Sequence, residues 1–272
     1  MAGLERIFGT PKPVIAMLHF PGLPGRPWHD RAAGRQHLVD VVGRDLGVLQ
    51  DAGVDGVLFC NEADIPYQLA VGPEIPAAMA AVIGEFRRDV RIPFGVNVLW
   101  DATASLALAR ATGAAFIREV LTGVYESDVG MIEPRIGEIA GYRTAIGADD
   151  VLLFDNIQPE FASAVGSRSI ADRARGAAFL GVDAILISGA AAGVQFDMGH
   201  LRAAKEAAGD VPVVANTGVR AERIAEIFSV ADAAIVGTSL KVDGVTWNAV
   251  DPDRAARLMD AARAARSAAT PA

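Results

Sequence analysis

The chain has 272 residues, enough for one large domain, and a barrel of eight strand–helix units needs about 250. Hydrophobic residues make up 51% of it, which predicts a large core and excludes a disordered chain. The net charge of −8 argues against a nucleic-acid surface, because phosphate backbones are held by excess Lys and Arg, but one small anion could still bind to backbone N–H groups.

The single cysteine, Cys60, rules out an intrachain disulfide and fits a reducing compartment. It lies inside an apolar run, which favours a core thiol over a nucleophile. No apolar stretch approaches the length of a membrane span, and the first residues lack the apolar segment of a signal peptide. These features predict a soluble, cytoplasmic protein without a transmembrane segment, and leave peripheral membrane attachment open.

Eight apolar, strand-like runs alternate with helix-like runs along the chain. The strand-like runs are 13–19, 56–62, 94–98, 114–120, 151–156, 184–188, 212–216 and 233–241. This alternation predicts an α/β protein with a parallel sheet, and eight repeats favour a single-domain (β/α)8 TIM barrel over an open sheet. No G-x-G-x-x-G follows the first run, which argues further against a dinucleotide-binding fold.

Two helices have clear sequence signals at their starts. Residues 31–52 carry apolar residues at helical spacing after Asp30, a plausible N-cap. Asp251 and Pro252 place an N-cap and a first-turn proline before the last helix. The barrel should span about residues 13–262, and the Ala/Arg-rich tail from Arg263 should be frayed.

Long loops are expected after the first, second and fourth strands. They cover residues 20–29, 63–76 and 121–142, and the third should contain a helix from Glu133 onward. Loops that follow barrel strands lie on the catalytic face, so these segments could be lids or binding walls. The alternatives are tolerated insertions or oligomer contacts, and a homo-oligomer remains plausible.

Polar residues close nearly every strand-like run, and in a barrel the carboxyl ends of the strands converge. The loops after strands seven and eight often bind phosphate, which here predicts a phosphate site at Thr217, Gly218, Val219, Gly237, Thr238 and Ser239. Glycine lets the backbone approach an anion, and the hydroxyl groups add donors. The alternative is that both segments are plain turns.

Four residues are candidates for catalysis. Asp155 follows an apolar run, where burial would raise the pKa of a carboxyl, although a structural role is as well supported. Glu119 follows Arg118, and because neighbouring strand residues face opposite sides, only one of the two can face the barrel interior. His19 is the only histidine at a strand end. Lys241 could bind an anion or form a Schiff base, or could pair with Asp243.

Six residues at strand ends are candidates for binding a hydroxylated, sugar-like substrate, and the four asparagines among them suit it because amides both donate and accept hydrogen bonds. They are Asn61, Glu62, Asn97, Asn156, Ser188 and Asn216. A divalent metal held by His19, Glu62, Asp64 or Asp155 is an alternative, but no compact ligand spacing supports it. We therefore predict no metal site and no cofactor.

Four segments give the chain a resemblance to a known family. The segments PVIAMLHFPGLPGRP, VDGVLFCNEADIPY, PFGVNVLWD and VGTSLKVDGVTWNAVDPDR together resemble the BtpA/SgcQ family, from Pro13 to Met259. The resemblance implies a TIM barrel. It also implies either a nucleosidase-like or sugar-processing protein or, from the branch named for photosystem I biogenesis, an assembly factor.

Two functional hypotheses follow. The first is an enzyme that acts on a phosphorylated sugar or nucleoside-type substrate at the barrel mouth, as a hydrolase, an isomerase or a lyase. The second is a non-catalytic assembly factor that keeps a ligand-binding barrel. A small anionic or sugar-like molecule is the expected partner in the first case, and nucleic acid in neither.

Overall fold

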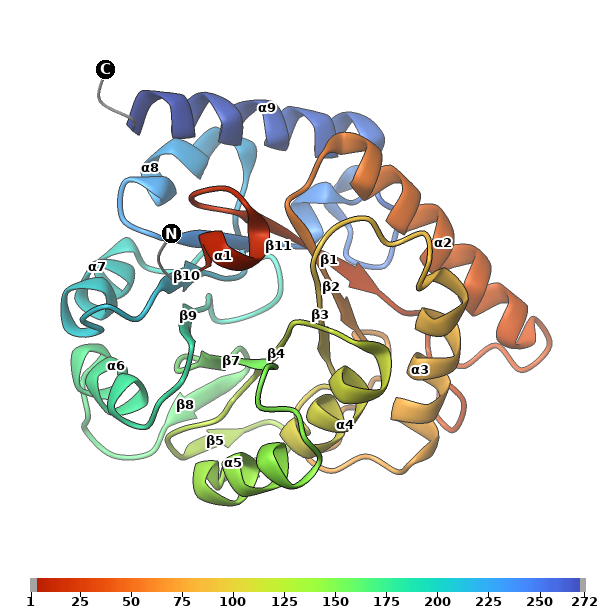
Figure 1. Cartoon of the computed structure of the whole chain (residues 1–272), viewed down its shortest axis with the longest axis horizontal. Coiled ribbons are helices and arrows are strands. Elements are labelled where there is room, and N and C mark those ends of the chain that lie inside the picture. The colour runs from red at the N-terminus through yellow and green to blue at the C-terminus, as the bar shows by residue number, and fades with distance from the viewer. Residues whose placement is uncertain (1–3, 270–272) are drawn as a thin grey trace.

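The computed structural model describes residues 4–269 and forms one domain around a closed eight-stranded parallel barrel (Figure 1). Its strands are β1 (Val14–His19), β2 (Gly56–Cys60), β3 (Phe94–Asn97), β4 (Phe116–Glu119), β7 (Leu152–Asn156), β9 (Ala184–Ile187), β10 (Val213–Ala215) and β11 (Ala233–Val236). Each strand pairs with its neighbour along the chain, and β1 pairs with β11 to close the ring. The predicted TIM barrel is confirmed.

Helices cover the outside of the barrel, as Figure 1 shows. They are α2 (Gly34–Ala52), α3 (Glu74–Phe86), α4 (Ala102–Thr112), α5 (Ile136–Ala145), α6 (Ile170–Phe179), α7 (Met198–Ala207), α8 (Ile224–Phe228) and α9 (Pro252–Ala269). The short helix α1 (Glu5–Phe8) precedes β1, and its Phe8 ring packs against Phe116 inside the barrel at 5.9 Å between centroids. Short 3-10 turns η1 (Ala221–Arg223), η2 (Thr238–Leu240) and η3 (Val242–Gly244) complete the later loops.

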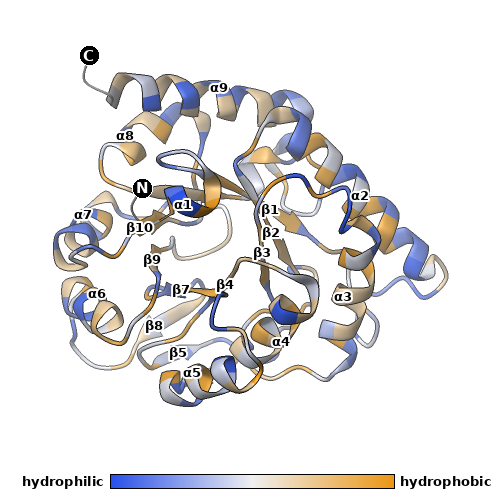
Figure 2. Cartoon of the chain, viewed as in Figure 1, coloured by the Kyte–Doolittle hydropathy of each residue, from blue (hydrophilic) through white to orange (hydrophobic). Residues whose placement is uncertain are grey.

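The core has two layers because neighbouring strand residues face opposite sides of the sheet. One layer fills the barrel interior and the other lies between strands and helices. In the interior the rings of Phe116 and Phe154 stack at 4.5 Å, and Gly95 leaves room for them: a Cβ there would lie 2.3 Å from the Phe116 ring. Figure 2 shows the resulting pattern, with mainly hydrophobic strands inside helices that also carry hydrophilic residues.

The two predicted helix starts have different outcomes. Asp251 accepts the backbone N–H groups of Asp253 and Arg254, so α9 begins as predicted. Helix α2 begins at Gly34 rather than at residue 31. Asp30 accepts the N–H groups of Ala32 and Ala33, so its carboxylate orders the turn that leads into the helix.

A small antiparallel sheet lies beside the barrel and was not predicted. It consists of β5 (Tyr125–Ser127), β6 (Gly130–Ile132) and β8 (Ala162–Ala164), in the order β6-β5-β8. The first two strands occupy the loop after β4, and β8 lies in the loop after β7. Strands of three residues are too short for an alternating pattern to reveal them. The helix expected from Glu133 begins at Ile136.

The expectation of a frayed tail from Arg263 is wrong for residues 263–269, which continue helix α9. Arg266 in this segment forms an ion pair with Asp55 and donates to the backbone oxygen of Lys12. These contacts hold the end of α9 against the amino-terminal side of the barrel. Within residues 4–269 no helix combines the length and the apolar character needed to cross a membrane.

Candidate active site at the barrel mouth

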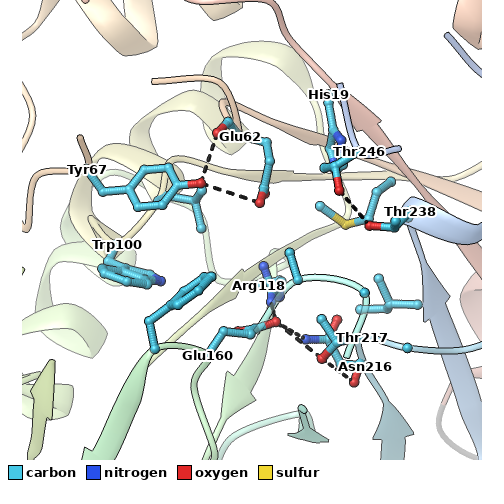
Figure 3. A pocket seen from close by; sticks show the side chains of 18 residues that line it. His19, Glu62, Tyr67, Trp100, Arg118, Glu160, Asn216, Thr217, Thr238 and Thr246 are labelled. Atoms are coloured by element: carbon cyan, nitrogen blue, oxygen red, sulfur yellow. Dashed lines mark hydrogen bonds and ion pairs between the residues drawn. The ribbon is translucent and has the colours of Figure 1, made fainter. Parts of the chain in front are cut away.

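A cavity that is partly open to solvent lies at the carboxyl ends of the strands. Its lining combines aromatic, charged and glycine residues from widely separated loops (Figure 3). They include His19, Glu62, Tyr67, Trp100, Arg118, Glu160, Phe161, Asn216, Thr217, Gly218, Gly237, Thr238 and Thr246. Polar residues at the strand ends therefore surround one mouth, as expected, but the residues that line the cavity are only partly the predicted ones.

Arg118, and not Glu119, faces the barrel interior. The Arg118 guanidinium lines the cavity and donates to Glu160 Oε1 at 2.9 Å and to Asn97 Oδ1 at 3.1 Å. Glu119 lies outside the cavity lining, where Oε1 accepts from Asn97 Nδ2 and from Ser105 Oγ of α4, both at 2.6 Å. The structure thus resolves an alternative that the sequence leaves open.

Glu160 was not among the predicted site residues. It lies in the loop between β7 and β8 and is buried, and its oxygens accept from Arg118, Asn216 and Asn156 at 2.9 to 3.2 Å. Its only sequence signal is an acidic residue four positions after the carboxyl end of a strand. Together Arg118 and Glu160 form a buried ion pair on the cavity wall.

Most of the predicted substrate-binding side chains do not line the cavity. They form hydrogen bonds that hold the Arg118–Glu160 pair in place. Asn97 holds Arg118, and Asn156 holds Glu160. Ser188 donates to Asn156 Oδ1 at 3.2 Å and accepts from Asn216 Nδ2 at 2.7 Å, which completes a chain of hydrogen bonds. Of these four side chains, only Asn216 lines the cavity.

Asn61 has a different role, because it ties two loops together. Its Nδ2 donates to Asp64 Oδ2 at 2.9 Å, and its Oδ1 accepts from the backbone of Leu99 at 2.8 Å. Asp64 in turn accepts the backbone N–H of Leu23 at 2.8 Å, so the loops after β1, β2 and β3 are joined.

Glu62 lines the cavity opposite the ion pair, as Figure 3 shows. The Tyr67 hydroxyl donates to the backbone oxygen of Glu62 at 3.0 Å and lies 3.5 Å from its carboxylate. Burial raises the pKa of Glu62 above its usual value, with nearby Glu160 adding to the rise and Arg118 opposing it. Burial also raises the pKa of the Cys60 thiol, which donates to Asn97 Oδ1 inside the barrel. The raised pKa suits Glu62 to exchanging a proton with a ligand. The raised pKa of Cys60 keeps it a neutral thiol.

His19 lines the cavity on the side of β1, as predicted. Burial and the charge of Lys241 lower the pKa of His19 to about 3, so the imidazole is neutral at physiological pH. Its Nδ1 is buried without a hydrogen-bond partner among the described residues. A neutral imidazole at this position can offer a hydrogen bond to a ligand but no positive charge.

The predicted phosphate residues gather at the end of the cavity, where it continues into a second hollow. Gly218, Gly237 and Thr238 line both, and Val219 and Ser239 line the second. Three arginines also line this second hollow: Arg220, Arg254 and Arg257. Ser239 Oγ donates to the Val219 oxygen at 2.7 Å and so ties the two loops together. Gly218 has φ +62°, and a Cβ there would lie 2.4 Å from the Gln195 backbone, so only glycine fits.

Asp155 and Lys241 lie outside the cavity lining. Asp155 is completely buried and accepts from Leu121 N at 2.8 Å and Thr122 Oγ1 at 2.6 Å, which fixes the loop after β4. Burial raises its pKa to about 6. Lys241 is buried against Asp45 of α2, at 3.0 Å, rather than paired with Asp243.

The four residues considered as metal ligands do not converge. Asp64 and Asp155 are each occupied by loop N–H groups, away from His19 and Glu62. Among residues 4–269, no three His, Cys, Asp or Glu side chains form a group that could hold a metal ion.

Comparison with known proteins gives strong matches along the whole chain. The model of the BtpA family matches residues 10–264. The putative sgc region protein SgcQ of Escherichia coli K12 is 45% identical over 96% of this chain and 97% of that protein. The photosystem I biogenesis protein BtpA of Synechocystis is 31% identical over 95% of this chain and 90% of that protein.

Solved structures with the same fold include phosphosugar enzymes. The structure titled native KDPGal aligns with a TM-score of 0.59 at 18% identity, over 94% of this chain and 96% of that one. The N-(5'-phosphoribosyl)anthranilate isomerase of Pyrococcus furiosus aligns with a TM-score of 0.55 at 11% identity, over 93% and 99%. At these identities the likeness concerns the fold alone.

Proposed function

The chain belongs to the BtpA family, and from this premise and the geometry of the mouth we propose that it is an enzyme acting on a small phosphorylated, sugar-like substrate. The observation that carries the proposal is the cavity at the carboxyl ends of the strands, with an ion pair and a carboxyl on its walls and glycine loops at one end. Related folds in phosphosugar enzymes agree with it.

The phosphate would bind to the loops after β10 and β11. Gly218 and Gly237 allow the backbone to approach the anion, and the adjoining hollow is lined by Arg220, Arg254 and Arg257. TIM barrels frequently bind phosphate at these two loops. The same hollow is also lined by Glu222 and Asp243, so the three arginines leave a small excess of positive charge there, and charges beyond about 10 Å are screened at physiological salt.

The chemistry would take place between Glu62 and Arg118. Glu62, whose pKa is raised, would give or take the proton, and Arg118 would stabilise negative charge that develops on a substrate oxygen. Glu160 would hold the Arg118 guanidinium in place, and Asn216 would bind a substrate hydroxyl. This arrangement suits the proton transfers of a hydrolysis or an isomerisation.

The alternative of a non-catalytic assembly factor is less well supported. A buried ion pair often lowers the stability of a protein relative to apolar residues at the same positions, because the free energy of desolvating the two charges exceeds their Coulomb attraction. A protein that needs only its outer surface would gain stability from apolar residues at Arg118 and Glu160. Their presence on a cavity wall favours a role in binding or catalysis.

Binding of ribose 5-phosphate tests the proposal. We expect ribose 5-phosphate to raise the melting temperature of the wild type, and Gly237→Asp to weaken its binding by about tenfold or more, because the new carboxylate repels phosphate. Titration calorimetry would measure both dissociation constants. Arg257→Glu, which changes an exposed side chain in the same hollow, gives an independent variant.

The matched control is Gly137→Asp, which adds the same charge at an exposed position in the first turn of α5. It should leave binding of ribose 5-phosphate unchanged. If Gly237→Asp and Arg257→Glu both bind ribose 5-phosphate as tightly as this control, the phosphate site is not at these loops.

A further inference from the structure

One wall of the cavity is aromatic. Tyr67, Trp100 and Phe161 come from the loops after β2, β3 and β7, and all three line the cavity. The rings of Tyr67 and Trp100 lie 5.5 Å apart between centroids. Three aromatic residues from three separate loops thus place apolar surface at the mouth, against which a flat group could pack.

Phe161 is held at this wall in an unusual conformation. Its side chain is 40% exposed, and its φ of +57° is one that bulky residues rarely adopt. The backbone N–H of Phe161 donates to the Ala190 oxygen at 2.9 Å, which fixes the loop in this geometry. A partly exposed ring on a strained backbone at the cavity wall favours contact with a ligand.

The aromatic wall and the proposed phosphate site lie at opposite sides of one cavity. Figure 3 shows Tyr67 and Trp100 on one side and Thr217, Asn216 and Thr238 on the other, with Arg118 and Glu160 between them. A ligand that spans the cavity therefore meets apolar rings at one end, the charged groups in the middle and the glycine loops at the other end.

We propose that the substrate is a phosphorylated sugar that carries a planar ring, with the phosphate at the glycine loops and the ring against Trp100 and Phe161. The sugar would then lie beside Glu62 and Arg118, where the bond between sugar and ring can be reached. A simple sugar phosphate would leave the aromatic wall exposed to water. This inference rests on the proposed function, because it uses the same phosphate site.

The affinities of three probes test the proposal: ribose 5-phosphate, adenosine 5'-monophosphate and adenosine. Stacking of a base on aromatic side chains should make adenosine 5'-monophosphate bind about five- to 150-fold more tightly than ribose 5-phosphate, the affinity ratio that corresponds to about 1–3 kcal/mol. Trp100→Leu and Phe161→Leu should each remove most of this difference and leave ribose 5-phosphate binding unchanged. Titration calorimetry measures all dissociation constants.

One control and one fallback variant make the result decisive. Phe179→Leu changes a ring at the end of α6 that is 89% exposed and outside the cavity lining, and it should alter no affinity. Trp100 packs partly against the core, so if Trp100→Leu fails to fold, the more exposed Phe161→Leu carries the test.

The outcomes separate this inference from the proposed function. Equal affinities of the wild type for ribose 5-phosphate and adenosine 5'-monophosphate, or an equal loss of both in Phe161→Leu, would overturn the ring-binding wall and leave the phosphate site intact. Adenosine binding as tightly as its monophosphate, with Gly237→Asp having no effect, would overturn the phosphate site and leave the ring-binding wall intact.

Discussion

At the scale of single residues, the site depends on which of two neighbours faces inward. Arg118 and Glu119 follow one another in β4, and the pleat sends the arginine into the barrel and the glutamate toward Ser105 of α4. The arginine has a carboxylate partner in the mouth, Glu160, whereas Glu119 accepts two neutral hydrogen bonds. Arg118 therefore contributes to the candidate site, whereas Glu119 affects the stability of the fold.

The first prediction concerns Glu119 and pH. Burial raises the pKa of Glu119 from 4.5 to about 8, so the folded protein keeps a proton that the unfolded chain loses above pH 4.5. Its contribution to stability is complete below pH 4.5 and is lost as the pH rises through about 8. Glu119→Gln cannot ionise and does not lose this contribution. As the pH rises from about 5 to about 9, the free energy of unfolding of the variant should therefore gain a few kcal/mol relative to that of the wild type.

Urea denaturation of both proteins at the two pH values measures this change. The control is Glu138→Gln, an exposed residue of α5, whose stability difference from wild type should stay constant. A Glu119→Gln difference that is also independent of pH would mean that Glu119 is ionised in the folded protein.

At the scale of elements, the long loops are joined to the barrel by buried polar contacts. The segment after β11 is held to α2 by Lys241 and Asp45, whose side chains are each 2% exposed. Asp45 also accepts the backbone N–H of Val250 at 3.3 Å. Lys241 thus connects the loop beside the proposed phosphate site to a helix.

The second prediction follows from this contact. Lys241→Met should lower the free energy of unfolding by about 1.5–3 kcal/mol, because it removes a hydrogen bond to the buried Asp45 carboxylate, which keeps its ion pair with Arg44. The double variant Asp45→Asn/Lys241→Met should be less costly than the single one, since it leaves no buried carboxylate, and the Arg44 side chain that loses its partner is half-exposed. Urea denaturation measures both. If the double variant loses as much as Lys241→Met, the cost arises from packing and not from charge.

At the scale of the whole molecule, the end of the chain reinforces the closed barrel. Arg266 of α9 connects to Asp55, just before β2, and to Lys12, just before β1. Its guanidinium also lies 5.9 Å from the centre of the Phe228 ring. These contacts join the first two strands to the last two helices at the amino-terminal side of the barrel.

The third prediction is that Arg266→Ala lowers the free energy of unfolding by about 1.5–3 kcal/mol, because it removes hydrogen bonds between charged and buried groups. Arg263→Ala, in the same helix, removes only a contact with exposed Asp260 and should change stability by about 0.5 kcal/mol or less. Thermal and urea denaturation compare the two. Equal effects would show that the last turns of α9 contribute little to the barrel.

The sequence alone determined the architecture of this protein. Eight apolar runs separated by helical segments can bury their surfaces only as a parallel sheet covered by helices, and the polar residue at each strand end marks the mouth. The glycine loops after the last two strands are also visible in the sequence, since their residues are adjacent.

Only the tertiary structure decided which side chains share the site. Glu160 meets Arg118 across 42 positions and Asn216 across 56, and no local pattern encodes such separations. A shift of one residue along a strand reverses the direction of a side chain, so the choice between Arg118 and Glu119 depends on the partners that the folded barrel supplies. Asp155 and Lys241 illustrate the same point, because each found its partners in loops or helices outside the cavity.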